Sequence, residues 1–201
     1  MNIIKLSRTE STEPDKEAMK AFFDKRTNKH IDLVKKYCKK IENFDSDRFD
    51  GLCDQAKDHD QSKFEDPEYE PYLYVTWSYK CKDDGKKFEV PEEIDKAMNE
   101  ATNHHVISNK HHPEYYSDKK VGLINRKDRD KPPAEMVDAT KMPILSIGEM
   151  CADWLAMSEE KGTNPEKWAD KNVNIRWKFN DEQKDTIYEI IGEIKVDEEE
   201  K

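Results

Sequence analysis

Apolar side chains between residues 16 and 44 recur every three to four positions, and this spacing is the strongest constraint on the fold. Because an α-helix repeats every 3.6 residues, these side chains form one stripe along a single helix. They are Met19, Phe22, Phe23, Val34, Tyr37, Cys38 and Ile41. Asp15 follows Pro14 and suits the N-cap position of such a helix. We therefore predict a long amphipathic helix from Lys16 to Phe44.

Further helices are predicted along the rest of the chain, with low strand content. Residues 72–80 are rich in aromatic and β-branched side chains, but we interpret them as a buried helix because no nearby segment offers a sheet partner. Pro91 suits the first turn of a helix. The predicted helices cover 16–44, 47–57, 72–80, 91–109, 142–158 and 181–194, with loops at 65–71 and 161–170. The fold class expected is all-α, a helical bundle.

The length of 201 residues is that of one domain of ordinary size. We expect an N-terminal extension at 1–14, a single compact helical domain over 15–195 and an acidic tail at 196–201. Residues 117–141 carry many charges, two adjacent prolines and no apolar period. They are predicted to form a long surface loop or lid.

The charge of the chain limits its partners. The formal net charge is -10, and 40% of the residues are charged. An acidic chain repels phosphate backbones, so we do not expect long nucleic acid as a partner. A small phosphorylated substrate remains compatible if bound metal ions supply positive charge locally.

The cysteines and the apolar runs indicate the compartment. The four cysteines are scattered without a CxxC pair, at Cys38, Cys53, Cys81 and Cys151. Such spacing fits reduced thiols better than a disulfide framework. No apolar run approaches the roughly 20 residues needed to cross a bilayer. We expect a cytoplasmic protein without a membrane partner, and an oligomer is compatible with the sequence.

Histidines carry the main chemical signal. The chain has six, namely His30, His59, His104, His105, His111 and His112, and four of them lie within nine residues. Neutral imidazole is the commonest metal ligand, and carboxylates complete sites for hard or borderline cations. His59 and Asp60 are adjacent and can aim two different ligands at one ion, while Asp153 interrupts an otherwise apolar helix face.

Each of these residues also has a purely structural interpretation. His30 lies on the apolar stripe of the first helix, where a buried histidine can simply donate to a backbone carbonyl. Asp153 can be a partly exposed carboxylate, since a buried one is costly unless it is paired or bound to metal. The four clustered histidines can form a solvated helix end, and Lys63 can be an ordinary surface lysine.

The order of His30, then the pair His59-Asp60, then Asp153 resembles the H…HD…D arrangement of the HD-domain metal-dependent phosphohydrolase superfamily. That superfamily is all-helical, in agreement with the apolar periodicity. More narrowly, the segments 59–64, 104–116 and 149–154 are similar to an uncharacterised bacterial and phage family of unknown function. The resemblance covers about residues 28–160.

The resemblance implies a ligand set. His30, His59, Asp60 and Asp153 would bind one divalent ion such as Mn, Co, Mg, Zn or Fe. The central histidines would bind a second ion or contact phosphate, and they are His104, His105, His111 and His112. In dinuclear members the two additional histidines come from separate helices, whereas here they share one segment.

These ligands imply a reaction. A bound divalent ion lowers the pKa of water from 15.7 toward about 7, and this provides hydroxide at neutral pH. Lys63 would bind phosphate, and Glu65 or His105 would protonate the leaving group. We therefore expect a phosphohydrolase acting on a nucleotide or nucleotide-like small molecule. Two alternatives stay open: a protein that binds and sequesters a nucleotide without turnover, and an HD-fold di-iron oxygenase.

Overall fold

The first helix begins and ends where the apolar spacing predicts. In the computed structural model, which describes residues 15–118 and 135–197, α1 spans Lys16–Phe44. The Asp15 side chain accepts hydrogen bonds from the backbone amides of Glu17 and Ala18, so it satisfies two donors that the helix itself leaves open. The predicted stripe lies inside the protein, where Val34, Cys38 and Ile41 are fully buried.

The described residues form a single compact domain made almost entirely of helices, which confirms the predicted fold class. The longer helices that follow α1 are α4 (Tyr69–Asp83), α5 (Glu92–Ser108), α6 (Ile144–Lys161), α7 (Pro165–Asn172) and α8 (Asp181–Glu193). Short helical turns are α2 (Ser46–Phe49), α3 (Leu52–Gln55), η1 (Ala56–Asp58), η2 (Gln61–Phe64) and η3 (Pro113–Tyr116). Strands β1 (Val137–Asp138) and β2 (Trp177–Lys178) pair in parallel, with Val137 opposite Trp177.

Two predicted segments have a different secondary structure from the one expected. Residues 47–57 do not form one helix, because Gly51 adopts a left-handed conformation with φ 85° between α2 and α3. Residues 161–170 are not all loop, since α7 begins at Pro165. Asn164 caps this helix by accepting a hydrogen bond from the Lys167 amide, and proline suits the first helical position.

Helix α4 is longer than the predicted range of 72–80 and takes in the end of the predicted loop at 65–71. It begins at Tyr69, so Pro71 lies in its first turn, where the missing N–H breaks no helical hydrogen bond. Its aromatic residues form a helix rather than a strand, as predicted.

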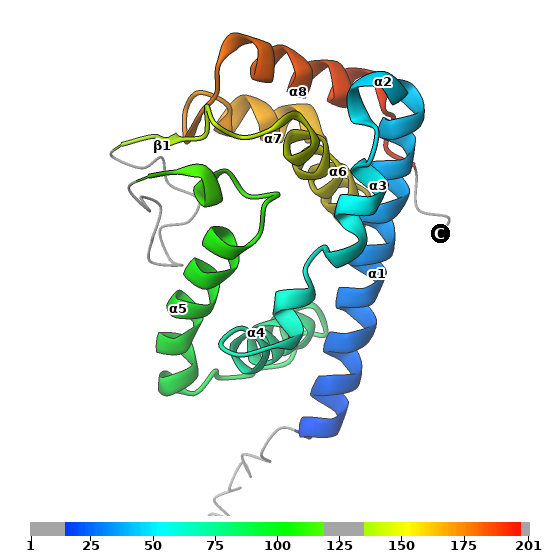
Figure 1. Cartoon of the computed structure of the whole chain (residues 1–201). Helices are drawn as coiled ribbons and strands as arrows, with labels where there is room; N and C mark the ends of the chain where they lie inside the picture. Colours follow the sequence, from blue (N-terminus) through cyan, green and yellow to red (C-terminus); the bar gives the residue numbers. More distant parts are fainter. Residues whose placement is uncertain (1–14, 119–134, 198–201) are drawn as a thin grey trace, which may run out of the picture.

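Helix α1 contributes to two separate apolar clusters. In Figure 1 it runs beside α4 at one end and beside α3 and α6 farther along. Its first half contributes Met19 and Phe23 to a small cluster shared with Leu73 and Tyr74 of α4. Its second half belongs to the main core, which includes residues of α2, α3, α6, α7 and α8. Thr27 and His30 of α1 are also buried, and they lie between the residues that this helix contributes to the two clusters. The polar side chains of α1 that are buried therefore lie where the two apolar clusters adjoin.

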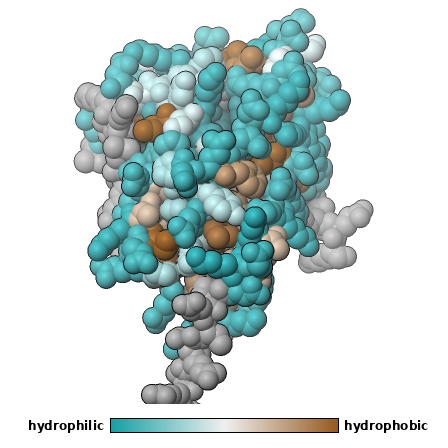
Figure 2. All heavy atoms as spheres, turned by 60° about the horizontal axis from the view of Figure 1, so that its bottom comes forward, coloured by the Kyte–Doolittle hydropathy of each residue, from teal (hydrophilic) through white to brown (hydrophobic). Residues whose placement is uncertain are grey.

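The face of the molecule seen in Figure 2 is mostly hydrophilic, with apolar residues scattered among hydrophilic ones. Of the helices within 15–118 and 135–197, none is long and apolar enough to span a membrane.

Several sequence predictions lie wholly or partly outside the described residues. These are the N-terminal extension at 1–14, most of the predicted loop or lid at 117–141, and the end of the acidic tail at 196–201. The described part of the 117–141 range includes β1, which starts at Val137. Asp197 in the tail makes ion pairs with Lys36 and Lys40 of α1.

Close contact between α6 and the α2–α3 segment yields a stability prediction. A Cβ atom added to Gly148 would lie 3.1 Å from Leu52 Cδ2 and 3.2 Å from Phe49 Cδ1, and both side chains are fully buried. We expect Gly148→Ala to lower the free energy of unfolding by about 1–2 kcal/mol, because overpacking outweighs the better helix propensity of alanine. Urea denaturation measures the change.

Gly192 provides the matched control for this substitution. It lies in α8, and nothing is within 4 Å of the position of an added Cβ. Gly192→Ala should therefore raise the free energy of unfolding by about 0.5–1 kcal/mol. Equal effects of the two substitutions would show that the contact at Gly148 is not tight.

Candidate metal centre

The Asp60 carboxylate is the centre of a buried cluster of imidazoles. Its Oδ2 atom lies 3.8 Å from Nε2 of both His30 and His59. Its Oδ1 atom lies 3.3 Å from His105 Nε2 and 3.7 Å from His111 Nε2. The two oxygens therefore face two different pairs of histidines.

The backbone at Asp60 is unusual and places this carboxylate. Asp60 connects η1 to η2 and has φ 59° and ψ 12°, the left-handed region that few side chains tolerate. Aspartate and asparagine adopt it more readily than most residues because their short polar side chains can bond locally. The sharp change of direction turns both His59 and Asp60 inward, where each is at most 2% exposed.

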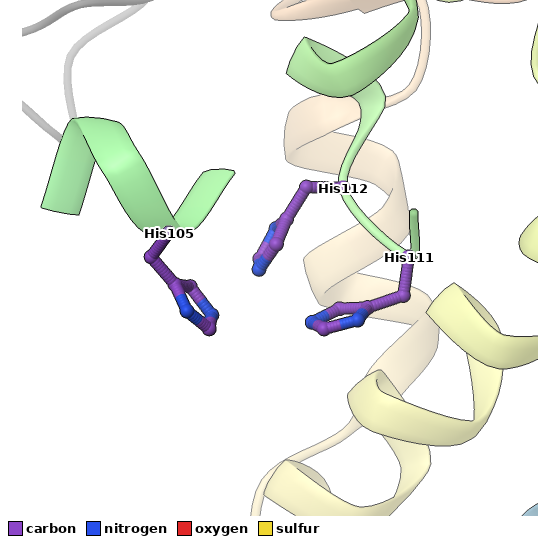
Figure 3. Close-up of side chains that lie close together, drawn as sticks. All are labelled: His105, His111 and His112. Carbon is purple, nitrogen blue, oxygen red and sulfur yellow. The ribbon is translucent and has the colours of Figure 1, made fainter. Parts of the chain in front are cut away.

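The remaining ligand candidates come from elements far apart in the sequence. His30 is on α1, and Asp153 on α6 places its Oδ1 atom 3.0 Å from His30 Nε2. His105 is in the last turn of α5, and His111 and His112 lie in the connection to η3. Figure 3 shows the three rings of this last group pointing toward one another. We call the seven residues His30, His59, Asp60, His105, His111, His112 and Asp153 the Asp60 centre.

A further set of carboxylates contacts four of these histidines at Nδ1, the ring nitrogen that faces away from Asp60. Glu160 Oε2 lies 3.2 Å from His30 Nδ1. Glu149 Oε1 lies 2.9 Å from His59 Nδ1 and 3.5 Å from His111 Nδ1. Glu68 Oε2 lies 2.8 Å from His105 Nδ1. Metal-binding histidines commonly donate their other ring N–H to a carboxylate, which fixes the tautomer and the ring orientation.

The centre holds its carboxyl groups ionised. Although burial alone favours the neutral acid, Lys63 and the imidazoles hold the pKa of Asp60 well below its usual range. The pKa of Glu149 falls to about 2, because hydrogen bonds from His111 and His59 outweigh burial. The pKa of Asp153 is also lowered, since His30 offsets its desolvation.

Burial and neighbouring charges shift the pKa of the histidines in different directions, upward for His30 and His105 and downward for His111 and His112. Burial lowers the pKa of His30, but contacts with Asp153 and Glu160 raise it overall to about 9. For His111 and His112, burial and neighbouring imidazoles lower the pKa, and for His112 it lies well below 6.5. Those two rings are therefore neutral at pH 7, which is the form that binds metal.

Lys63 lies beside the centre rather than on an open surface. Its Nζ atom is 2.5 Å from Asp60 Oδ2, and it lies over the ring of Tyr72 at 5.6 Å from the centroid. The side chain remains 20% exposed. The ammonium is therefore held against the centre by a side chain that is not fully enclosed.

The residues fit a divalent cation. Three buried atoms of the centre make no hydrogen bond within the described part of the chain: His59 Nε2, Asp60 Oδ1 and His112 Nε2. A buried polar atom without a partner is costly, so native structures rarely keep one without a role. The ligand atoms of His30, His59 and Asp60 lie within 4.8 Å of one another, and so do those of His105, His111 and His112. Imidazole and carboxylate suit zinc, iron, manganese or cobalt.

Two of the residues singled out from the sequence lie outside this arrangement. His104 Nδ1 contacts the other oxygen of Glu68 at 2.7 Å, and its side chain is 39% exposed. His104 belongs to none of the close ligand groups found among the described residues. Glu65 is exposed at the end of η2, where its backbone carbonyl accepts hydrogen bonds from the amides of Glu68 and Tyr69.

Sequence reasoning did not assign the orienting carboxylates Glu68, Glu149 and Glu160. Glutamate is common in this acidic chain, so its presence alone indicates nothing. The sequence does contain one signal for Glu149, which is its spacing from Asp153. Glu149 precedes Asp153 by four residues on α6, so the two side chains share one face of that helix. Glu68 lies only eight residues after Asp60, but no local pattern indicates that it turns inward.

The chain belongs to a protein family of unknown function (DUF5662), whose model matches residues 19–193. That range contains every residue of the Asp60 centre and all three orienting glutamates. No curated protein and no solved structure matches the chain.

Replacement of Asp60 by asparagine tests whether the centre binds metal. An asparagine at this position would tolerate the left-handed backbone but carry no charge between the imidazoles. We expect Asp60→Asn to remain folded and to retain less than about a tenth of the metal of the wild-type protein, measured by elemental analysis. Asp58→Asn is the matched control, because Asp58 is exposed two residues away. Equal metal contents in the two variants would place the metal elsewhere.

Proposed function

We propose that this protein is a metal-dependent phosphohydrolase of the HD type, acting on a nucleotide or nucleotide-like small molecule. One observation carries the proposal: a buried aspartate whose two oxygens face separate pairs of histidines. The order of these residues along the chain matches the pattern that suggested the HD superfamily from sequence.

Two groups of residues beside Asp60 would each hold a divalent ion. His30, His59 and Asp153 would hold one divalent ion on the Oδ2 side. His105, His111 and His112 would hold another on the Oδ1 side. Ions in such positions supply a water of lowered pKa and polarise the phosphoryl oxygen.

Lys63 is the residue proposed to bind the substrate phosphate. Its ammonium lies against Asp60 and its side chain is 20% exposed, so a rotation of this long side chain would bring the ammonium to an entering phosphate oxygen. An ammonium at that position stabilises negative charge that develops on the phosphoryl group. This positive charge, together with that of the metal ions, also counters the acidic character of the chain.

The histidines differ in their suitability for proton transfer. His105 donates its Nδ1–H to Glu68 and directs Nε2 to Asp60, and this geometry supports a role as a ligand rather than as the proton donor considered from sequence. His104 contacts the same glutamate and is partly exposed. His104 is thus the clustered histidine best placed to exchange protons with solvent.

A phosphate-release screen over a nucleotide panel, combined with elemental analysis, tests the proposal. The wild-type protein should contain a divalent metal and release phosphate or pyrophosphate from at least one nucleotide. His59→Ala and Asp60→Asn should lower the turnover by a factor of about 100 or more, whereas Asp58→Asn should leave it unchanged. Retained turnover in His59→Ala and Asp60→Asn would contradict the proposal.

The same experiment separates the alternatives. Tight nucleotide binding without turnover, across several metals, would indicate a sequestering protein. Iron in protein purified in air, with an optical absorption typical of a di-iron centre, would indicate an oxygenase.

The pH dependence of metal binding follows from His30. Because the pKa of its imidazole is about 9, His30 carries a proton at pH 7 that an ion must displace. The affinity for Mn²⁺ should therefore rise about tenfold per pH unit between about pH 6 and 8 for each proton released, and level off above about pH 9. Calorimetry in buffers with different ionisation enthalpies counts the protons. An affinity independent of pH would show that His30 is not a ligand.

A further inference from the structure

Glu149 contacts one histidine from each side of the Asp60 centre. Its Oε1 atom lies 2.9 Å from His59 Nδ1 and 3.5 Å from His111 Nδ1, and the two rings are 4.1 Å apart between centroids. Its Oε2 atom accepts a hydrogen bond from Gln55 Nε2 at 2.8 Å. Glu149 as a whole is 3% exposed, so bulk water has little access to these contacts.

The shared oxygen determines the tautomer of both rings. An ionised carboxylate only accepts hydrogen bonds, so the Nδ1 atoms of His59 and His111 must carry the protons. When the two rings are neutral, each presents a bare Nε2 toward Asp60, which is the orientation that a metal ligand needs. His59 faces Oδ2 of Asp60 and His111 faces Oδ1.

We propose that Glu149 is a positioning residue that couples the two ion positions, so that an ion bound on either side of Asp60 strengthens binding on the other. The inference rests on the proposed function for the existence of the ion positions, and it adds the residue that links them. Apart from Asp60 itself, no other carboxylate in the described ranges contacts a ligand histidine from each side.

The physical basis is a shared ordering step. A cation at His59 Nε2 would make the Nδ1–H of that ring a stronger donor, and this would strengthen the hydrogen bond that already holds the Glu149 carboxylate. His111 then meets an acceptor that is already in place, so less ordering entropy is lost when the second ion binds. Because linkage is reciprocal, the same coupling holds in the other order of binding.

Charge in and around the centre favours two ions despite their mutual repulsion. Five carboxylates meet there with one ammonium, that of Lys63, which leaves four negative charges once a bound ion has displaced the proton that His30 carries at pH 7. These carboxylates are Asp60, Glu68, Glu149, Asp153 and Glu160. Two divalent cations balance that charge, and one does not. Burial makes an unbalanced charge costly, so the second ion gains from electrostatic attraction.

Glu160 and Glu68 provide two matched controls. Each of them contacts the Nδ1 atom of a ligand histidine on only one side of the Asp60 centre. Glu160 holds His30, whose Nε2 faces Oδ2 of Asp60. Glu68 holds His105, whose Nε2 faces Oδ1. Replacing any of the three by glutamine keeps the size of the side chain and removes its charge. Only Glu149→Gln should affect both ion positions.

The experiment is a Mn²⁺ titration of the full chain after chelation, for the wild type, Glu149→Gln, Glu160→Gln and Glu68→Gln. Calorimetry gives the two binding constants, and electron paramagnetic resonance at half an equivalent of Mn²⁺ distinguishes isolated ions from pairs. Wild-type protein should show exchange-coupled pairs even at this low loading. Glu149→Gln should show isolated ions, with the affinity for each ion lowered about 10–100-fold.

Glu160→Gln and Glu68→Gln should each weaken one binding step and keep the pair signal at half an equivalent. Pairs in Glu149→Gln at wild-type affinity would overturn the inference, and so would isolated ions in the wild type at half an equivalent. If Glu149→Gln does not fold, Glu149→Asp replaces it, because the shorter carboxylate cannot reach both rings. The same loss of pairs is expected in that variant.

Failure of the inference can be distinguished from failure of the proposed function. Two ions that bind independently, with nucleotide turnover intact, would overturn the coupling alone. A single ion per chain with turnover would also overturn the coupling and leave a mononuclear phosphohydrolase. Absence of any metal binding would overturn both.

Discussion

The buried Asp60 carboxylate is the feature on which the rest of the structure depends. An isolated charge inside a protein costs many kcal/mol, and the group would bind a proton unless partners favour the ion. Here the partners are four imidazoles and the Lys63 ammonium, drawn from α1, η2, α5 and the loops beside η1 and η3. The helices must therefore meet at this point for the charge to be tolerated. The arrangement of the helices brings the partners of Asp60 together, and the need to pair this buried charge in turn favours that arrangement.

Apolar packing and the orienting glutamates together fix the geometry of the centre. Helix α1 passes from one apolar cluster to another with His30 between them, and close-packed surroundings limit rotation of the imidazoles. An imidazole can bind metal through either ring nitrogen. A hydrogen-bond partner at one nitrogen therefore decides that the other nitrogen is free to bind metal. Glu68, Glu149 and Glu160 provide that partner. Since the family has no known function, the chemistry is argued from this site rather than from the fold.

The sequence by itself determined the features that depend on neighbours along the chain. The bounds of α1 followed from apolar spacing and from Asp15, since helix periodicity and capping act over a few residues. The histidines stood out because they are rare and clustered. The sequence did not predict that Gly51 separates two short helices or that Asn164 begins another. Several conformations compete at such positions, and tertiary packing selects one of them.

Only the tertiary structure decided which oxygen of Asp60 faces which imidazole ring. Adjacent residues such as His104 and His105 have identical chemistry, and the packing of α5 against Glu68 turns one toward Asp60 and leaves the other partly exposed. Likewise, the ordinary glutamate at 149 became a link between two histidines through contacts that span 90 residues in one case. Such contacts depend on the relative placement of whole helices, and no local pattern records that placement.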